Sequence, residues 1–195
     1  SGIRIFGRRI KSLVFSTDVA IIKNINADAS SPCIPLRPSR LSHRPFCRCR
    51  RCRCLPGWGW PHQWAEVGQH RRLCRASGGL WLVCNTFITE EAIRAIKETV
   101  EIPLVYTVVS EQADVAGKLA AGVDFLNVSG AARTPEIVAH IREQFPEVPI
   151  IATGGPTDDT IRATIEAGAN AITYTPPTSA ELFSESMRKY RGRFA

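Results

Sequence analysis

From residue 82 onward, short apolar runs alternate with segments that have apolar residues at helical spacing. The apolar runs lie at residues 82–84, 102–109, 123–128, 149–153 and 171–175. Between them, apolar residues fall three or four positions apart, as on one face of an amphipathic helix; Ile93, Ile96 and Val100 are an example. This alternation predicts repeated βα units and hence a parallel sheet.

Polar residues and glycines mark the ends of the predicted helices. Thr89, Ser110 and Thr157 precede helical segments and are expected to be N-caps. Gly122 and Gly168 stand where two of these helices must end. Each helix therefore has a predicted start or stop that agrees with the apolar pattern.

An internal repeat supports the same organisation. A shift of 46 residues places residues 101–104 on 147–150, Thr107 on Thr153, and residues 121–122 on 167–168. Each repeat spans two βα units, as expected for a barrel in which alternate strands supply alternate interior layers. We therefore predict one (β/α)8 TIM-barrel domain over residues 1–195, with a doubly wound open sheet as the alternative.

Composition changes abruptly between residues 29 and 82. This stretch holds all four Trp, six of the seven Cys and ten Arg, but no Lys, no Asp and a single Glu. The net charge of +7 arises here, and the rest of the chain is slightly acidic. The overall charge is therefore weak evidence for nucleic-acid binding, and the region of strands 2 and 3 is expected to be disrupted or irregular.

The Arg-Cys run at residues 47–54 has three interpretations. A thiolate metal site is one, but structural zinc sites favour C-x2-C pairs, whereas this run has two C-x-C units among arginines. A basic nucleic-acid-binding arm is the second. The third, which we favour, is GC-rich coding DNA translated out of frame, so neither a metal site nor a nucleic-acid partner is expected.

The genetic code supports the third interpretation. Codons that encode residues 30–39 can be read one base earlier as IAVYPFTPQ, a buried strand followed by a loop. The single Trp codon forces glycines in the other shifted frame near residues 58–65, giving a glycine-rich loop GGG-H-T-N-G. Two different shifts are needed, and the original frame returns near Leu82.

Residues 11–24, 150–157 and 169–177, together with the reframed IAVYPFTP and GGG-x-TNG, resemble one family. It is a family of bacterial TIM-barrel proteins that is uncharacterised or loosely labelled "hydrolase". The resemblance implies a barrel related to phosphate-binding (β/α)8 barrels, and it implies no settled reaction.

Candidate site residues follow from the barrel, because ligands sit at the carboxyl ends of the strands. Consecutive glycines ahead of a helix N-terminus suit a phosphate, although a simple tight turn is the alternative. We expect the phosphate-binding residues to be Thr153, Gly154, Gly155 and Thr157. Other ligand-binding candidates at strand ends are Asn85, Asn127, Ser129 and Tyr174.

Asp18 is the one carboxylate among the strand-end candidates. It is the candidate general base, and a helix N-cap is the alternative interpretation. We predict an enzyme that acts on a small phosphorylated metabolite as a lyase, isomerase or hydrolase, with no particular cofactor indicated. The alternatives are a non-catalytic ligand-binding or regulatory barrel and a non-functional frameshift product.

Cysteine usage and apolar run lengths indicate the compartment. The number of Cys is odd and Cys84 lies on an apolar run, so a disulfide framework is not expected. The N-terminal apolar run at residues 12–15 is too short for a signal peptide, and no run reaches transmembrane length. We expect a cytoplasmic protein with no membrane partner.

Overall fold

The computed structural model describes residues 2–16, 18, 21, 24–31, 80–155, 157–177 and 179–192. The strands are β1 (Ile3–Ile5), β2 (Arg8–Ile10), β3 (Ser12–Phe15), β4 (Ala29–Ser31), β5 (Leu82–Cys84), β6 (Leu104–Val108), β7 (Phe125–Val128), β8 (Ile150–Thr153) and β9 (Ala171–Tyr174). The helices are α3 (Glu90–Thr99), α4 (Val115–Ala120), the 3₁₀ turn η1 (Ala131–Arg133), α5 (Thr134–Gln144), α6 (Asp158–Glu166) and α7 (Ser179–Arg191).

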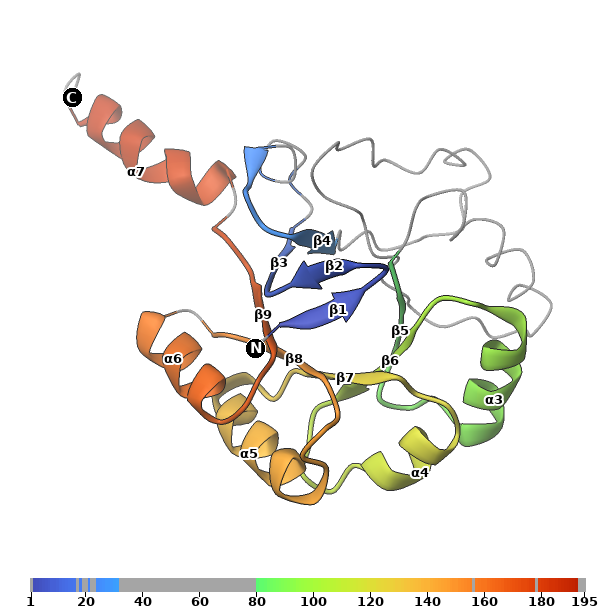
Figure 1. Ribbon diagram of the computed structural model, residues 1–195. Coiled ribbons are helices and arrows are strands. Elements are labelled where there is room, and N and C mark those ends of the chain that lie inside the picture. The colour runs from blue at the N-terminus through green and yellow to red at the C-terminus, as the bar shows by residue number, and fades with distance from the viewer. Residues whose placement is uncertain are drawn as a thin grey trace.

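A parallel sheet forms the body of the fold. It has seven strands in the order β4-β3-β9-β8-β7-β6-β5, and every neighbouring pair is parallel. The sheet curls so that β3, the first strand of this sheet along the chain, pairs with β9, the last (Figure 1). This confirms the predicted parallel sheet of βα units, and the curled half-barrel is of the α/β-barrel type rather than an open doubly wound sheet.

The two ends of the anomalous segment differ from the expectation of irregular structure. Residues 29–31 form β4, which pairs in regular parallel register with β3. At the other end, Leu80 and Trp81 are both 1% exposed, and Trp81 packs edge-on against Phe125. The predicted irregularity is therefore wrong at these ends, and residues 32–79, with the Arg-Cys run, lie outside the described residues.

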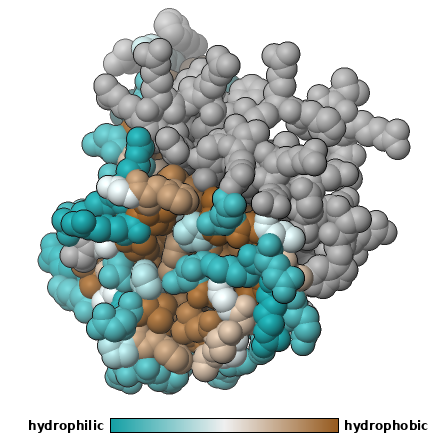
Figure 2. Space-filling model, turned by 45° about the vertical axis from the view of Figure 1, so that its right-hand side comes forward, coloured by the Kyte–Doolittle hydropathy of each residue, from teal (hydrophilic) through white to brown (hydrophobic). Residues whose placement is uncertain are grey.

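Two separate apolar cores lie on the two faces of the sheet. The outer core joins outward residues such as Leu104, Leu126 and Ile150 to helices α3 and α5. The inner core fills the barrel and contains Val105, Phe125, Ile151 and the residues Ile3, Ile5, Ile10, Leu13, Ala29, Leu80, Trp81 and Ala171. Polar residues cover much of the outer surface, with apolar surface between them (Figure 2).

The β1–β2 hairpin closes the amino end of the barrel, which sequence patterns did not predict. Ile3, Ile5 and Ile10 belong to the inner core, and the hairpin lies across the centre of the sheet (Figure 1). Its turn residues Phe6 and Gly7 have φ of 47° and 76°. Two left-handed residues are what a tight antiparallel hairpin requires.

The helix ends confirm several of the predicted caps. Thr89 and Thr157 are N-caps whose hydroxyls accept backbone hydrogen bonds from Ala92 and Thr160. Ser110 is not a cap, since the next helix is capped by Asp114 four residues later. The reason is an intervening turn, in which the Ser110 hydroxyl accepts from Gln112 N.

The internal repeat has a structural counterpart at the amino ends of the strands. Asp124 Oδ2 accepts from Leu104 N at 2.7 Å, and Asn170 Oδ1 accepts from Ile150 N at 2.8 Å. Both pairs are related by the 46-residue shift. Asp28 Oδ2 repeats this contact with Ser12 N at 3.1 Å, so each acceptor ties the start of one strand to the start of its neighbour.

Candidate functional site

The interior of the barrel changes from apolar to polar along the strands. Side chains of a strand alternate between the two faces, and inner-core members Val105, Phe125, Ile151 and Ala171 fix which face points inward. Two residues farther along each strand, the inward positions hold a set that we call the upper layer: Thr107, Asn127, Thr153 and Thr173. This layer lies toward the carboxyl ends, where barrel enzymes bind their ligands.

The upper layer consists of two neighbouring pairs at different heights: Asn127 is opposite Ile151, so Thr153 and Thr173 lie two residues farther toward the carboxyl ends than Thr107 and Asn127. Thr107 is opposite Asn127, and Thr153 is opposite Thr173. Asn127 Nδ2 donates to Thr107 Oγ1 at 3.5 Å, and the Thr153 hydroxyl donates to Ser129 Oγ at 3.4 Å. Both distances exceed those of strong hydrogen bonds, so these side chains keep capacity to bind a ligand.

Gly154 and Gly155 make the turn from β8 into α6, and they have different structural roles. Gly154 N donates to Thr173 O at 3.1 Å, so this amide completes the sheet. A Cβ at Gly154 would lie 2.7 Å from Ile172 Cγ2 and 2.8 Å from Ile161 Cγ1. Gly155 has φ +76°, the left-handed conformation that favours glycine.

The first turn of α6 is closed by a capping box. Thr160 N donates to Thr157 Oγ1 at 3.3 Å, and Thr157 N donates to Thr160 Oγ1 at 3.2 Å. These two amides are therefore used within the chain. The amides of Asp158 and Asp159 belong to the first helical turn and have no partner within the helix, so they are donors that an anion could use.

Three sequence-predicted site residues have local structural roles or lie elsewhere. Asp18 Oδ1 accepts from Ile21 N at 3.3 Å, which is the geometry of an N-cap. Asn85 Oδ1 accepts from Phe87 N at 3.1 Å in a turn after β5. Tyr174, 40% exposed, follows inward-facing Thr173 and therefore lies on the outer side of β9. The structure brings Ser129 beside Thr153, which leads directly into the turn of Gly154, Gly155 and Thr157. Asn127 lies lower in the barrel and contacts Thr107.

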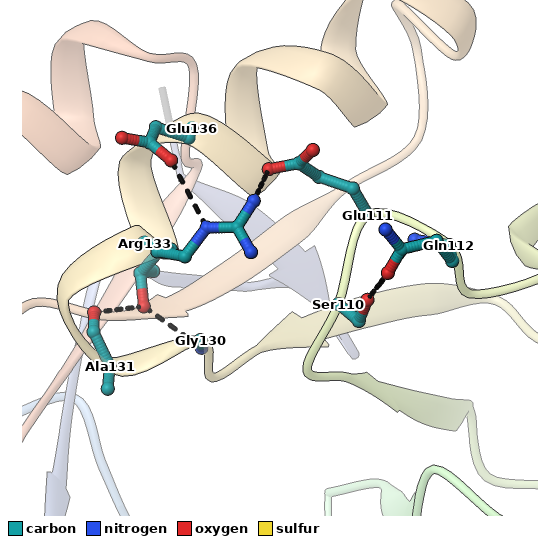
Figure 3. A network of polar contacts seen from close by, with 8 residues as sticks. Ser110, Glu111, Gln112, Gly130, Ala131, Arg133 and Glu136 are labelled. Carbon is teal, nitrogen blue, oxygen red and sulfur yellow. Dashed lines mark hydrogen bonds and ion pairs between the residues drawn. The ribbon is translucent and has the colours of Figure 1, made fainter.

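A polar network at the rim was missed by the sequence patterns (Figure 3). Arg133 Nη2 lies 2.6 Å from Glu111 Oε1, and its Nε lies 3.4 Å from Glu136 Oε2. The hydrogen bond that Arg133 donates to Glu136 and the negative charge of Glu111 raise the pKa of Arg133. Since Glu111 follows β6 and Arg133 follows β7, the pair links two neighbouring rim loops.

Thr107 and Thr173 were also missed, although the repeat contained a signal for them. The 46-residue shift relates Thr107 to Thr153 and Asn127 to Thr173. Because Thr153 and Asn127 were candidate site residues, the repeat could have identified Thr107 and Thr173 as candidates too. For Arg133 and Glu111 no sequence signal existed, because they are 22 residues apart on exposed loops.

The described residues offer few groups for metal or thiol chemistry. No group of three or more His, Cys, Asp or Glu that could hold a metal lies among them. Cys84 is buried, and burial raises the pKa of its thiol to about 12, so at neutral pH it is protonated and a poor nucleophile. Among the described helices, none is both long and apolar enough to cross a membrane.

Comparisons with known proteins agree on the type of fold. The chain is 30% identical over 133 residues to a thiamine-phosphate synthase of Geobacillus thermodenitrificans, covering 55% of this chain and 60% of that enzyme. It thus spans less than two thirds of that relative. No protein-family model matches it, and none of these likenesses supports the label "hydrolase".

Solved structures give the same result. The orotidine 5'-phosphate decarboxylase of Pyrococcus horikoshii OT3 is similar with a TM-score of 0.60 and 16% identity, over 84% of this chain and 88% of that one. A protein described as a phosphonomutase from Burkholderia cenocepacia J2315 gives 0.61 and 13%, over 94% and 91%. The chain has a TIM-barrel-type fold.

Proposed function

We propose that the chain is a barrel enzyme that acts on a small phosphorylated metabolite. The phosphate binds at Gly155 and the first turn of α6, and the rest of the metabolite lies over the upper layer. The reaction is a lyase, isomerase or hydrolase reaction on that metabolite. The names of a thiamine-phosphate synthase and an orotidine 5'-phosphate decarboxylase support the phosphorylated class.

One observation carries this proposal. The left-handed Gly155 leads into an N-terminal helical turn directly beside the inward-facing Thr153. Unpaired amides and the helix dipole make such a turn favourable for an anion. If the phosphate of a metabolite binds at this turn, the rest of the metabolite lies at the carboxyl end of the barrel.

The two acidic residues of this turn set the strength of the site. Asp158 and Asp159 are exposed, and their negative charges oppose an incoming phosphate. Water and salt screen exposed charges, so the repulsion is partial. Asp158→Asn with Asp159→Asn should therefore bind inorganic phosphate more tightly at low salt, and the gain should shrink as salt is added.

A direct test compares two glycines that have the same backbone conformation. Gly155 and Gly7 both have φ +76°, but a Cβ at Gly7 meets no atom within 4 Å. Gly155→Asp should abolish binding of inorganic phosphate through bulk and like charge, and Gly7→Asp should retain it. Calorimetric or NMR titration of the full chain measures both, with circular dichroism to verify folding.

Any side chain introduced at position 155 would also meet Thr160, since a Cβ built on Gly155 lies 2.6 Å from Thr160 Oγ1. Gly155→Ala therefore reports the loss caused by the disturbed capping box alone. Saturable phosphate binding that Gly155→Asp leaves unchanged would place the phosphate elsewhere. Absence of binding for every phosphorylated compound would refute the proposed function.

A second candidate is a ligand-binding or regulatory barrel without catalysis. Among the described residues, the upper layer carries no acid or base, and Asp18 is used as a cap. Proton-transfer catalysis requires a group that exchanges protons near the operating pH. A ligand that binds but is never converted would favour this candidate.

A further inference from the structure

The upper layer consists of neutral side chains that both donate and accept hydrogen bonds. Thr107, Asn127, Thr153 and Thr173 are all half-buried. A threonine hydroxyl offers one donor and two acceptor positions, and an asparagine amide offers two donors and an acceptor oxygen. The side-chain contacts at 3.4 and 3.5 Å leave much of this capacity unused.

Hydroxyl groups match this lining, because they also donate and accept. A bound hydroxyl can accept from Asn127 Nδ2 while it donates to a threonine oxygen, so that neither partner is left unsatisfied. Buried polar groups are costly when unpaired. The lining therefore favours a ligand that presents several hydroxyls rather than an apolar group.

The charges around the mouth disfavour a second anionic group. We counted the charged side chains in the described loops after β6, β7 and β8 and in the first three residues of each following helix. There is one cationic side chain, Arg133, and there are five carboxylates: Glu111, Asp114, Glu136, Asp158 and Asp159. Arg133 already contacts two of them.

A carboxylate that entered the upper layer would lose water and meet no cationic side chain among these described groups. Loss of hydration without a compensating partner is unfavourable for a charged group. The described loops after β6, β7 and β8 are predominantly negative, which adds repulsion during entry past them. The phosphate avoids this cost because it stays at the exposed turn before α6.

We infer that the upper layer binds the uncharged, hydroxylated part of a phosphorylated polyol and discriminates against a metabolite that carries a carboxylate at the same position. This inference rests on the proposed function. It names the substrate class for the same site: a polyol phosphate rather than a phosphorylated acid.

A matched pair of ligands tests the inference. Glycerol 3-phosphate and 3-phosphoglycerate have the same carbon chain, but the first ends in a hydroxymethyl group and the second in a carboxylate. We expect glycerol 3-phosphate to bind the full chain about tenfold more tightly, which corresponds to one well-made hydrogen bond. Calorimetry at constant salt, with inorganic phosphate as the reference, gives the three affinities.

Conservative variants assign the discrimination to the upper layer. Thr107→Val and Thr153→Val remove a hydroxyl at nearly constant volume, and each should weaken glycerol 3-phosphate about three- to tenfold. Thr107→Val, which lies away from the glycine turn, should leave the affinity for inorganic phosphate unchanged. Thr99→Val is the matched control: its hydroxyl donates to Ile96 O at 2.8 Å within α3 and is remote from the mouth.

The outcomes separate this inference from the function on which it rests. Equal or tighter binding of 3-phosphoglycerate overturns the inference but leaves a phosphate-binding barrel intact. Binding of glycerol 3-phosphate that both valine variants leave unchanged also overturns it. If inorganic phosphate and both organic phosphates fail to bind the folded chain, the proposed function fails, and the inference fails with it.

Discussion

Gly154 is expected to serve packing rather than phosphate binding, and Gly154→Ala tests this. The added Cβ would lie 2.7 Å from Ile172 Cγ2 and 2.8 Å from Ile161 Cγ1, below any ordinary contact distance. Gly154 is buried, so α6 or β9 must shift to make room. Overpacking of this kind costs about 1–3 kcal/mol.

That cost translates into a measurable change in melting temperature. For a domain of about 200 residues, 1 kcal/mol corresponds to roughly 2–4 °C. We therefore expect Gly154→Ala to lower Tm by about 2–12 °C. Urea unfolding followed by circular dichroism gives the free energy independently, with an unchanged m-value as the sign of an intact native state.

A double-mutant cycle locates the strain. Ile161→Ala removes the Cγ1 atom that the new methyl group meets. Gly154→Ala should therefore cost less in the Ile161→Ala background than alone. Strict additivity would show that α6 is not what opposes the methyl group.

The same variant also addresses ligand binding. Gly154 N donates to Thr173 O within the sheet, so phosphate affinity of the folded variant should stay near that of the parent. A Tm unchanged by Gly154→Ala, combined with weaker phosphate binding, would refute this reasoning and return Gly154 to the phosphate site.

Three further outcomes are expected. Ile10→Ala should destabilise the chain by about 2–5 kcal/mol in urea unfolding, because Ile10 is 2% exposed in the inner core; a loss below 1 kcal/mol would show that the hairpin is not tightly docked. Burial raises the pKa of Asp28, but hydrogen bonds from Lys11 and Ser12 outweigh it and lower the pKa below 3.8. A lowered carboxyl pKa stabilises the fold above the unfolded value, so Asp28→Ala should destabilise at neutral pH and its effect should fade as the pH drops through the folded pKa; a pH-independent effect would contradict this. Cys84, with a pKa of about 12, should resist alkylation at pH 7 until urea unfolds the chain, as peptide mapping would show; rapid native labelling of Cys84 would contradict its burial.

The parallel strands were predictable because their signal is local. Apolar runs such as residues 102–109 and 149–153 stand between clear helical segments, and the repeat supports their division into βα units. The β1–β2 hairpin could not be predicted from the sequence, because Ile3 and Ile5 give only two alternating apolar positions among arginines. A three-residue strand is too short for a period to show.

The site was only partly predictable. Strands covered on both faces show no alternation of apolar and polar residues. The sequence therefore could not show that Thr107 faces the interior of the barrel. For Asp18, a cap and a catalytic base have the same sequence signature, and the bond from Ile21 N shows the cap. The glycine turn was found because glycines before a capped helix form a local motif.

The frameshift hypothesis stays a prediction, and Leu80 is the described residue that departs from the pattern of the other strand starts. The bond from Leu82 N to Pro103 O matches that from Leu126 N to Pro149 O. Leu80 therefore corresponds to Asp124, and likewise to Asp28 and Asn170, the polar acceptors at strand starts. A leucine at this place breaks the pattern just before the frame is predicted to return. Sequencing the coding DNA across codons 28–84 tests the hypothesis; an uninterrupted frame would reject it.

Among the described residues, the β1–β2 hairpin closes the amino end of the half-barrel. Ile3, Ile5 and Ile10 fill that end from within, so a molecule bound over the upper layer cannot reach solvent through the amino end. Of two products bound in the interior, the one nearer the carboxyl ends of the strands would dissociate first, and the deeper one would dissociate after it. For a bond-cleaving reaction, product inhibition would then be unequal, because the deeper product can rebind only after the outer one has gone.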